Sequence, residues 1–394
     1  MLAPPSLFRH RRTGTGLSPT ASTFNPELLP CVPGLYTGGS AAIPALGFRQ
    51  ERKEPRNTSR LLLPVSKPRP MFASLLQTIT YSAFRITIQS AMHPNLRYCA
   101  VIPVYNGADT IAHAIESVLA QTNPPDEVVV VDDGSDDDSA IVASRYSSSV
   151  HVVRQPNAGP GAARNRGVRD SSAEWVAFLD ADDTWLPEKM ERQMALLGDS
   201  RVGVVHARGT LSPSPAPPIV TFENLWAENC IRLSSTIVRR TAWESVGGFD
   251  ESPGLISVED HNLWLRLAVA GWTIVTCPED LIQYNQATGG LSYRTESFAR
   301  AEFTNYDKIG ELLKLEREVV RSKILKLHVK HGRSLLHRRE MSSARRLLGV
   351  PLRESPCRET LRLWLATFVP ARLLDLRRNF RELSRGTELP SRSS

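Results

Sequence analysis

The sequence predicts an α/β fold in which a mostly parallel sheet is flanked by helices. Short, almost continuously apolar segments alternate with helical ones from residue 98 onward. Such strands are typical of a parallel sheet covered on both faces. Several of them end in acidic or glycine-containing turns, and the carboxyl ends of strands are where open α/β sheets bind ligands.

The first predicted strand, 98–104, leads into a turn at 105–107. A helix follows, capped by Asp109 or Thr110. Its apolar face consists of Ile111, Ile115, Val118 and Leu119. The next strands are 127–131, which ends in the acidic turn at 132–135, and 150–154, which precedes a helix through 162–168.

The fourth strand, 176–179, ends in Asp180, Asp182 and Asp183. If the extended geometry persists, Asp180 and Asp182 point the same way. A hard divalent cation suits this pair, because Mg²⁺ usually takes one or two protein carboxylates, with waters and phosphate oxygens in its other positions. The alternative is that these acids only cap the next helix or solvate a turn.

The second half continues the alternation less regularly. Pro187 opens a helix, and a loop at 212–218 separates two strand candidates. The strand candidates are 201–206 and 234–239, a helix is expected at 259–270, and basic amphipathic helices begin near residue 298.

Composition limits the class of protein. The chain has 394 residues, 41% of them hydrophobic, and a net charge of +7, which is enough for one large domain with appendages or for two domains. The basic excess lies mostly at the two ends, so we expect no nucleic-acid partner. No apolar stretch is long enough for a transmembrane helix. Five scattered cysteines without a CxxC pair favour a reducing compartment.

Three regions are expected. Residues 1–91 are rich in Pro, Ser, Thr and Arg and predict a disordered leader. The leader is either an organellar transit peptide or an overlong reading frame that precedes Met92, and we favour the second. Residues 92–297 form the predicted α/β domain. Residues 298–394 form a helical extension that either packs on this domain or lies on anionic lipid.

Five motifs in order resemble the signatures of family 2 glycosyltransferases with the Rossmann-like GT-A fold. They are IPVYNGADTI, VVVVDDGSDDDS, NAGPGAARNRG, VAFLDADDTW and EDHNLWLRL, within residues 98–292. The resemblance implies an enzyme that moves a sugar from a nucleotide diphosphate donor to a hydroxyl group, mostly with inversion and with Mg²⁺ or Mn²⁺. By resemblance only, UDP is the default nucleotide.

The resemblance also assigns the nucleotide site. Pro103 and Tyr105 match the part that lines the base pocket, where an aromatic face can stack on a base. Asp133, together with Asp132, matches the contact to the uracil or ribose. Arg164 matches a position that approaches the nucleotide, and a guanidinium is a fitting partner for the diphosphate. We interpret Asp136, Asp137 and Asp138 as a solvated turn.

The remaining assignments concern the reaction. Asp180 and Asp182 match the DxD element, with Asp182 as the more direct metal ligand. Asp260, in the pair with Glu259, matches the catalytic base, although acids at a helix start can simply complement the helix dipole. Trp264 either stacks on a sugar ring or packs in the core.

One segment departs from the family pattern. Many relatives carry a basic or histidine-containing segment after the last strand, whereas residues 284–292 read YNQATGGLS. Asn285 or Gln286 substitutes, another loop supplies the contact, or the metal affinity is lower. The third metal ligand therefore stays open.

The resulting hypothesis is a glycosyltransferase acting on a glycan or a lipid-linked acceptor in cell-surface polysaccharide or glycolipid synthesis. It would be located in the cytoplasm, free or peripheral on the inner face of the membrane. The alternative is a catalytically inactive GT-A protein that binds nucleotide sugars. A Rossmann dehydrogenase is disfavoured, because Tyr105-Asn106-Gly107 stands where its first glycine-rich turn belongs.

Overall fold

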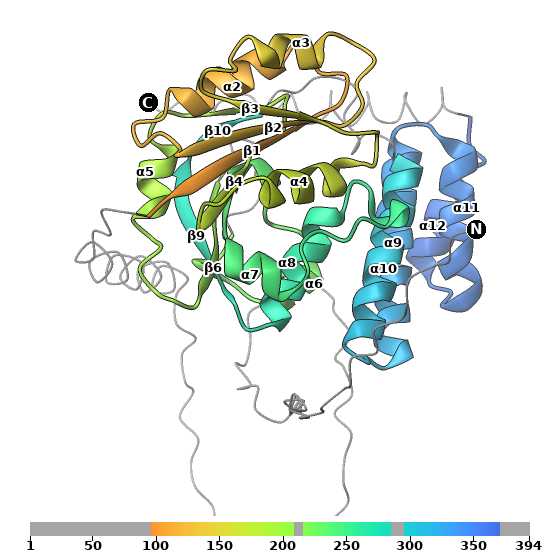
Figure 1. The fold of residues 1–394 in the computed structure, drawn as a ribbon. Coiled ribbons are helices and arrows are strands. Elements are labelled where there is room, and N and C mark those ends of the chain that lie inside the picture. Colours follow the sequence, from red (N-terminus) through yellow and green to blue (C-terminus); the bar gives the residue numbers. More distant parts are fainter. Residues whose placement is uncertain (1–95, 209–215, 285–294, 371–394) are drawn as a thin grey trace, which may run out of the picture. The chain divides into compact units, whose positions relative to one another are not determined.

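The computed structural model describes residues 96–208, 216–284 and 295–370. Within these residues, eight strands form one sheet in the order β3-β2-β1-β4-β8-β6-β9-β7 (Figure 1). The strands are β1 (Tyr98–Val104), β2 (Glu127–Asp132), β3 (His151–Arg154), β4 (Trp175–Phe178), β6 (Val202–Arg208), β7 (Ile219–Val220), β8 (Thr236–Arg239) and β9 (Thr273–Asp280).

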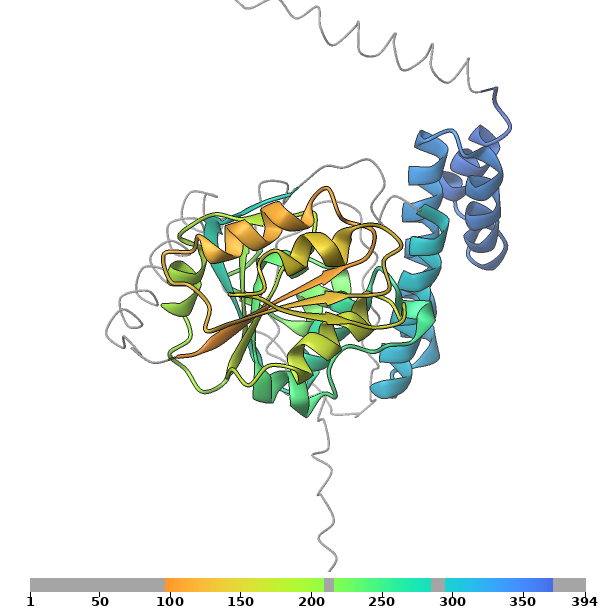
Figure 2. The ribbon, with the colours of Figure 1, turned by 45° about the horizontal axis from the view of Figure 1, so that its top comes forward.

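Helices cover both faces of this sheet, as the alternation of β1 requires. Tyr98, Ala100, Ile102 and Val104 belong to one apolar cluster, whereas Cys99 and Val101 belong to the other. The first cluster contains residues of α2 (Ile111–Leu119), α3 (Ser139–Ser144) and α5 (Lys189–Met194). The second contains residues of α4 (Pro160–Arg169), α6 (Phe222–Ala227), α7 (Arg240–Ser245) and α8 (Glu259–Val269). Figure 2 shows α2 and α3 on the opposite side of the sheet from α4 and α7.

The parallel pairing brings the carboxyl ends of four strands to one edge. β1 pairs in parallel with β2 and with β4, and β2 pairs in parallel with β3. Val104 is opposite Asp132, and Asp132 is opposite Arg154. The turns after these strands, which carry the predicted nucleotide and metal residues, therefore lie at the same edge.

Strand β8 joins the two halves of the sheet. It lies between β4 and β6 and is antiparallel to both, while β6 and β9 are parallel. A second, small sheet forms where β10 (Ile282–Gln283) pairs antiparallel with β5 (Thr184–Trp185).

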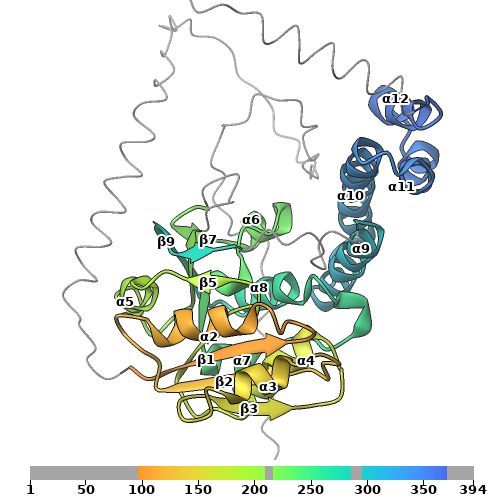
Figure 3. The same cartoon turned by 90° about the horizontal axis from the view of Figure 1, so that it is seen from above.

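Within the described residues, four helices follow the sheet: α9 (Thr295–Leu312), α10 (Arg317–His337), α11 (Met341–Glu354) and α12 (Arg358–Ala366) (Figure 3). Helix α9 packs against α8. Asn305 of α9 accepts a hydrogen bond from Asn262 of α8 at 2.9 Å, and its amide lies 3.4 Å from a ring nitrogen of His261. Lys308 of α9 pairs with Asp250 at 2.6 Å. Among the described residues, no helix combines the length and the apolar composition needed to cross a membrane.

The predicted elements are largely confirmed. The strand at 98–104 has the predicted bounds, and the other predicted strands and helices agree within a few residues. Not predicted were the short elements β5, β7, β10, α3, α6 and α7, and the eight-residue strand β9. The conditional expectation of extended geometry through Asp182 was wrong, because β4 ends at Phe178 and a turn follows.

Other expectations fall on residues outside the described ranges. They are the leader at 1–91, residues 212–215 of the predicted loop, Asn285 and Gln286 in the departing segment, and the last part of the C-terminal extension.

Candidate functional site

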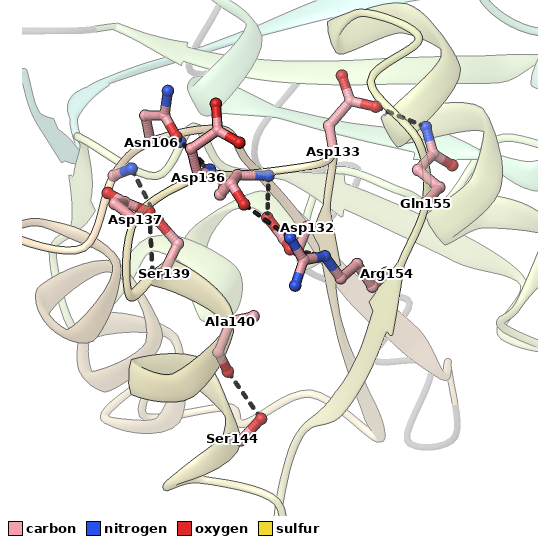
Figure 4. Close-up of polar contacts among 12 residues, drawn as sticks. Asn106, Asp132, Asp133, Asp136, Asp137, Ser139, Ala140, Ser144, Arg154 and Gln155 are labelled. Atoms are coloured by element: carbon pink, nitrogen blue, oxygen red, sulfur yellow. Dashed lines mark hydrogen bonds and ion pairs between the residues drawn. The ribbon is translucent and has the colours of Figure 1, made fainter.

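The turns after β1 and β2 hold each other in place (Figure 4). The backbone N–H of Asn106 donates to the Ser135 hydroxyl at 3.0 Å, and the side-chain oxygen of Asn106 accepts from the N–H of Asp136 at 2.9 Å. Asp137 accepts from the N–H of Ala108 at 3.0 Å, so this exposed carboxylate also fixes the turn. Beside these turns, Tyr105 is 52% exposed. A side chain that stacks on a base needs such an accessible ring face.

Asp132 and Asp133 are buried and point to different neighbours in Figure 4. Asp132 pairs with Arg154 at 3.1 Å. Asp133 accepts from the Gln155 amide at 2.8 Å and from the backbone N–H groups of Ala158 and Gly159 at 2.9 and 2.8 Å. Three of the roughly four acceptor positions of this carboxylate are therefore occupied. Asp133 anchors the loop that leads into α4.

The turn after β4 presents its aspartates in different environments. The N–H of Asp183 donates to the carbonyl of Asp180 at 3.1 Å, which closes the turn. Ser234 holds it from the other side: its hydroxyl accepts from the N–H of Asp180 at 3.1 Å and donates to the buried carboxylate of Asp183 at 2.6 Å. Asp182 is exposed. Partial desolvation, and then the charge of Asp180, raise the pKa of Asp182.

Arg164 connects this turn to the start of α8. Its guanidinium donates to Asp180 at 2.8 Å and to Glu259 at 2.6 Å, and Arg164 is only 5% exposed. Burial disfavours the charged form, but the charges of Asp180 and Glu259 outweigh it and hold the pKa of Arg164 above its ordinary value. The predicted direct contact with a diphosphate fits this geometry less well than a role in which Arg164 positions the two carboxylates.

Asp260 lies next to this bridge. Its carboxylate accepts a hydrogen bond from the backbone N–H of His261 at 2.6 Å and another from the side-chain amide of Asn229 at 3.4 Å. Burial, followed by the charge of Glu259, raises the pKa of Asp260 to about 7, and the charge of Asp180 acts in the same direction. The Arg164 bridge joins the turn after β4 to the start of α8. The charge of Asp180 raises the pKa of both Asp182 and Asp260, in keeping with this arrangement.

Two further predicted residues, Pro103 and Trp264, make no side-chain hydrogen bond to the acidic turns among the residues that the structure describes. Pro103 is half-buried at the end of β1. Trp264 is 0% exposed within the core cluster that includes Leu263 and Leu267. The sugar-stacking alternative for Trp264 is therefore corrected to the core-packing one, since its ring presents no open face.

Sequence reasoning missed Ser234 and Asn229. Both lie near residues already singled out, but 54 and 31 positions away along the chain from Asp180 and Asp260, respectively. Neither belongs to a recognisable motif, so only the fold could identify them.

The site is rich in oxygen ligands but does not form a closed protein cage. Among the described residues, no group of three or more His, Cys, Asp or Glu side chains is arranged to hold a metal ion. An open arrangement of one or two carboxylates, completed by other oxygen atoms, is what a hard cation such as Mg²⁺ uses at phosphate sites.

Known proteins resemble this chain in sequence and in fold. Residues 99–220 match the model of "Glycosyl transferase family 2". The amylovoran biosynthesis glycosyltransferase AmsB of Erwinia amylovora is 27% identical over 226 residues, which cover 52% of this chain and 74% of AmsB. The succinoglycan biosynthesis protein ExoO of Rhizobium meliloti is 46% identical over 96 residues, which cover 24% of this chain and 28% of ExoO.

Among solved structures, the mannosyltransferase PcManGT from Pyrobaculum calidifontis, in complex with GDP-Man and Mn²⁺, matches with a TM-score of 0.52 and 19% sequence identity. The match covers 79% of this chain and 94% of PcManGT. This likeness shows the fold, which is the expected GT-A fold. The match over residues 99–220 and the glycosyltransferase relatives support a sugar-transferring enzyme of family 2, as the five motifs predicted.

Proposed function

We propose that this glycosyltransferase moves a sugar from a nucleotide diphosphate donor, by default a UDP-sugar, to a hydroxyl group of a glycan or a lipid-linked acceptor, with inversion. The observation that carries the proposal is the Arg164 bridge between Asp180 and Glu259, which joins the predicted metal turn to the helix start that carries the predicted base, Asp260. The names of AmsB and ExoO support a role in polysaccharide synthesis.

In this proposal Asp182 and Asp180 hold Mg²⁺ or Mn²⁺. Their carboxylates fit such a cation, because they are close enough for Asp180 to raise the pKa of Asp182, and a cation relieves this repulsion. The bound cation would neutralise negative charge on the departing diphosphate. Arg164 holds the Asp180 carboxylate, and Ser234 holds the turn through the N–H of Asp180 and the carboxylate of Asp183.

Asp260 is the proposed general base. Inversion needs a single displacement, in which the acceptor oxygen attacks the anomeric carbon from the face opposite the diphosphate. Asp260 would accept the proton of this hydroxyl group as it attacks. A carboxyl group with a pKa near 7 is well matched to this task at neutral pH.

The nucleotide is proposed to lie over the turns after β1 and β2. Tyr105, beside Pro103, would stack on the base. Asp132 and Asp133 keep this pocket in shape, and Asp133 retains about one acceptor position for the base or ribose.

We also propose a peripheral contact with the inner face of the membrane through the C-terminal helices. On α12, Leu361 and Leu365 are exposed four residues apart, and Phe368 just beyond the helix is exposed as well. Arg358 and Arg362 on this helix are also exposed. An apolar face beside cationic side chains is typical of helices that lie on anionic lipid.

A binding and turnover screen tests the proposal. The full chain is incubated with UDP-, GDP- and dTDP-sugars, with and without Mg²⁺ or Mn²⁺, and both nucleotide binding and sugar release are measured. We expect cation-dependent turnover of one donor class. Binding without turnover of any donor would favour the alternative of an inactive nucleotide-sugar-binding protein.

A further inference from the structure

The small sheet of β5 and β10 brings Tyr284 to the acidic turn. Ile282 is opposite Trp185 and Gln283 is opposite Thr184 in this antiparallel pair. Continuing the register by one residue places Tyr284 across from Asp183, the residue that closes the turn of Asp180. The β5 side of this pair is fixed in turn by Trp185, whose indole N–H donates to the carbonyl of Ser234 at 2.8 Å.

The hydroxyl group of Tyr284 is buried but unused. Its ring packs against the core cluster under α2, and within the described part of the chain its hydroxyl has no hydrogen-bond partner. Leaving a buried hydroxyl unpaired is unfavourable, and native proteins rarely do so without a functional reason. A hydroxyl in this position is suited to a ligand that arrives later.

The charges around this hydroxyl indicate which ligand it suits. Burial, followed by the charge of Asp183, raises the pKa of Tyr284 above its ordinary value. The charge of Arg232 lowers this pKa, whereas the charges of Asp180 and Asp260 raise it further. The phenol therefore stays protonated at neutral pH and can donate a hydrogen bond. A protonated phenol is a weaker ligand for Mg²⁺ or Mn²⁺ than the neighbouring carboxylates.

Arg232 supplies a second donor on the same side. Its side chain is exposed, and the described residues provide no ion pair or hydrogen bond for its guanidinium. It lies two residues before Ser234, which holds the acidic turn. A guanidinium and a hydroxyl near the same turn can both donate to the anionic oxygens of a phosphate group, whereas the aspartates of that turn only accept.

We propose that the Tyr284 hydroxyl and the Arg232 guanidinium donate hydrogen bonds to the diphosphate of the nucleotide-sugar donor. This inference rests on the proposed function, because it assigns the diphosphate of that donor to the side of the site formed by β10 and the residues before β8. It adds two donor-binding residues to a site whose predicted members near the turn are mainly carboxylates.

The test is a calorimetric titration of the full chain with nucleotides in the presence of Mg²⁺. UDP, GDP and dTDP identify the diphosphate that the unaltered protein binds, and the corresponding nucleoside serves as the reference probe. We expect Tyr284→Phe and Arg232→Gln each to weaken diphosphate binding about tenfold or more, as for hydrogen bonds to a charged group. Nucleoside binding should not change.

The matched control is Tyr146→Phe, because this tyrosine lies in the turn after α3 and its hydroxyl donates to Glu116 at 2.6 Å. We expect it to bind the diphosphate normally. We also expect Tyr284→Phe to melt at an unchanged or higher temperature without nucleotide, since it removes an unpaired buried hydroxyl. The exposed Arg232→Gln variant keeps the test decisive if Tyr284→Phe does not fold.

Three results would overturn the inference. Unchanged diphosphate affinity in both variants would remove the contact while leaving the proposed function in place. An equal loss of nucleoside affinity would move the contact to the base, and weaker Mn²⁺ binding without nucleotide would make Tyr284 a metal ligand. Failure of the unaltered protein to bind any of the three diphosphates would instead overturn the proposed function itself.

Discussion

Four charged side chains define the site at the scale of single residues. Arg164 comes from α4, Asp180 from the turn after β4, and Glu259 and Asp260 from the start of α8. Two of the carboxylates are paired with the guanidinium, whereas Asp260 is left with a raised pKa. This division separates the two carboxylates that Arg164 binds from one that can exchange a proton at neutral pH.

The first prediction concerns the proposed base. We expect Asp260→Asn to lower turnover by about 10²- to 10⁴-fold, the usual contribution of general base catalysis, and to leave nucleotide binding intact. The measurement is kcat with the donor identified by the screen, together with the Kd of the nucleotide. Asp109→Asn, at an exposed position before α2, is the control and should retain full activity. Near-normal turnover in Asp260→Asn would exclude it as the base.

The second prediction concerns pH. Because the folded-state pKa of Asp260 is raised from 3.8 to about 7, the base is protonated and inactive on the acidic side. We expect kcat/KM to fall about tenfold per pH unit below 7.

The stability of the fold should change with pH in the opposite direction. Between about pH 4 and 7 the folded chain binds more protons at Asp260 than the unfolded chain does, so this group makes stability decrease as pH rises. Asp260→Asn should lack that contribution to the slope, which pH-dependent melting would show.

Secondary-structure elements hold these residues through close packing. Gly167 of α4 faces Val101 of β1 so closely that an added Cβ would overlap a methyl group of Val101. This contact sets the distance between α4 and the sheet. Arg164 lies one turn earlier on the same helix, so the position of its guanidinium depends on that distance.

The third prediction follows from this contact. We expect Gly167→Ala to destabilise the protein by about 1–3 kcal/mol through overpacking and to reduce turnover, because it shifts Arg164. Adding Val101→Ala should restore part of both, since it removes the overlapping methyl groups. Gly198→Ala is the control, because nothing lies within 4 Å of its added Cβ. Denaturant unfolding and kcat measure the effects, and the absence of rescue would argue against this packing mechanism.

The sequence was informative about elements with strong local signals and uninformative about contacts across the chain. The run 98–104 is apolar throughout, which is why its bounds were predicted correctly. β9 was missed because Pro278, Glu279 and Asp280 end an otherwise apolar segment with residues that are rare in strands. The partners of Arg164 lie 16 and 95 residues away, a distance that no periodicity reveals. Trp264 has the same local pattern whether it faces a sugar or the core.

At the scale of the whole molecule, α9 supports the reactive helix from behind. Asn305 is 0% exposed and bonds to residues 261 and 262, directly after Asp260. Ile309 of the same helix belongs to the core cluster that lies under α8. The described helical extension is therefore connected to the position of the proposed base.

The fourth prediction tests this connection. Asn305→Ala leaves the buried amide of Asn262 without its partner, and we expect a loss of about 1–3 kcal/mol. Thermal melting should show a decrease of several degrees, and kcat should fall as well. Asp307→Ala, exposed on the same helix, should change neither. If Asn305→Ala lowers the melting temperature without affecting kcat, α9 stabilises the fold but does not position Asp260.

The fifth prediction concerns α12 and the membrane. We expect the full chain to float with vesicles that contain anionic phosphatidylserine and not with neutral phosphatidylcholine vesicles. Leu365→Asp, which places a charge on the exposed apolar face, should abolish flotation without changing turnover of a soluble acceptor. Ser355→Asp, at an exposed position before α12, is the control. Equal flotation of Leu365→Asp would exclude this face.

The place of β8 in the sheet has a practical consequence for anyone who would isolate the recognisable part of this chain. The segment shared with the family ends at residue 220, yet the strand that lies beside β4 begins at Thr236. A gene fragment cut at the boundary of the shared segment would leave β4 with bare backbone donors and acceptors, a template for aggregation. The stretch recognised by sequence likeness is thus smaller than the stretch that must be expressed together.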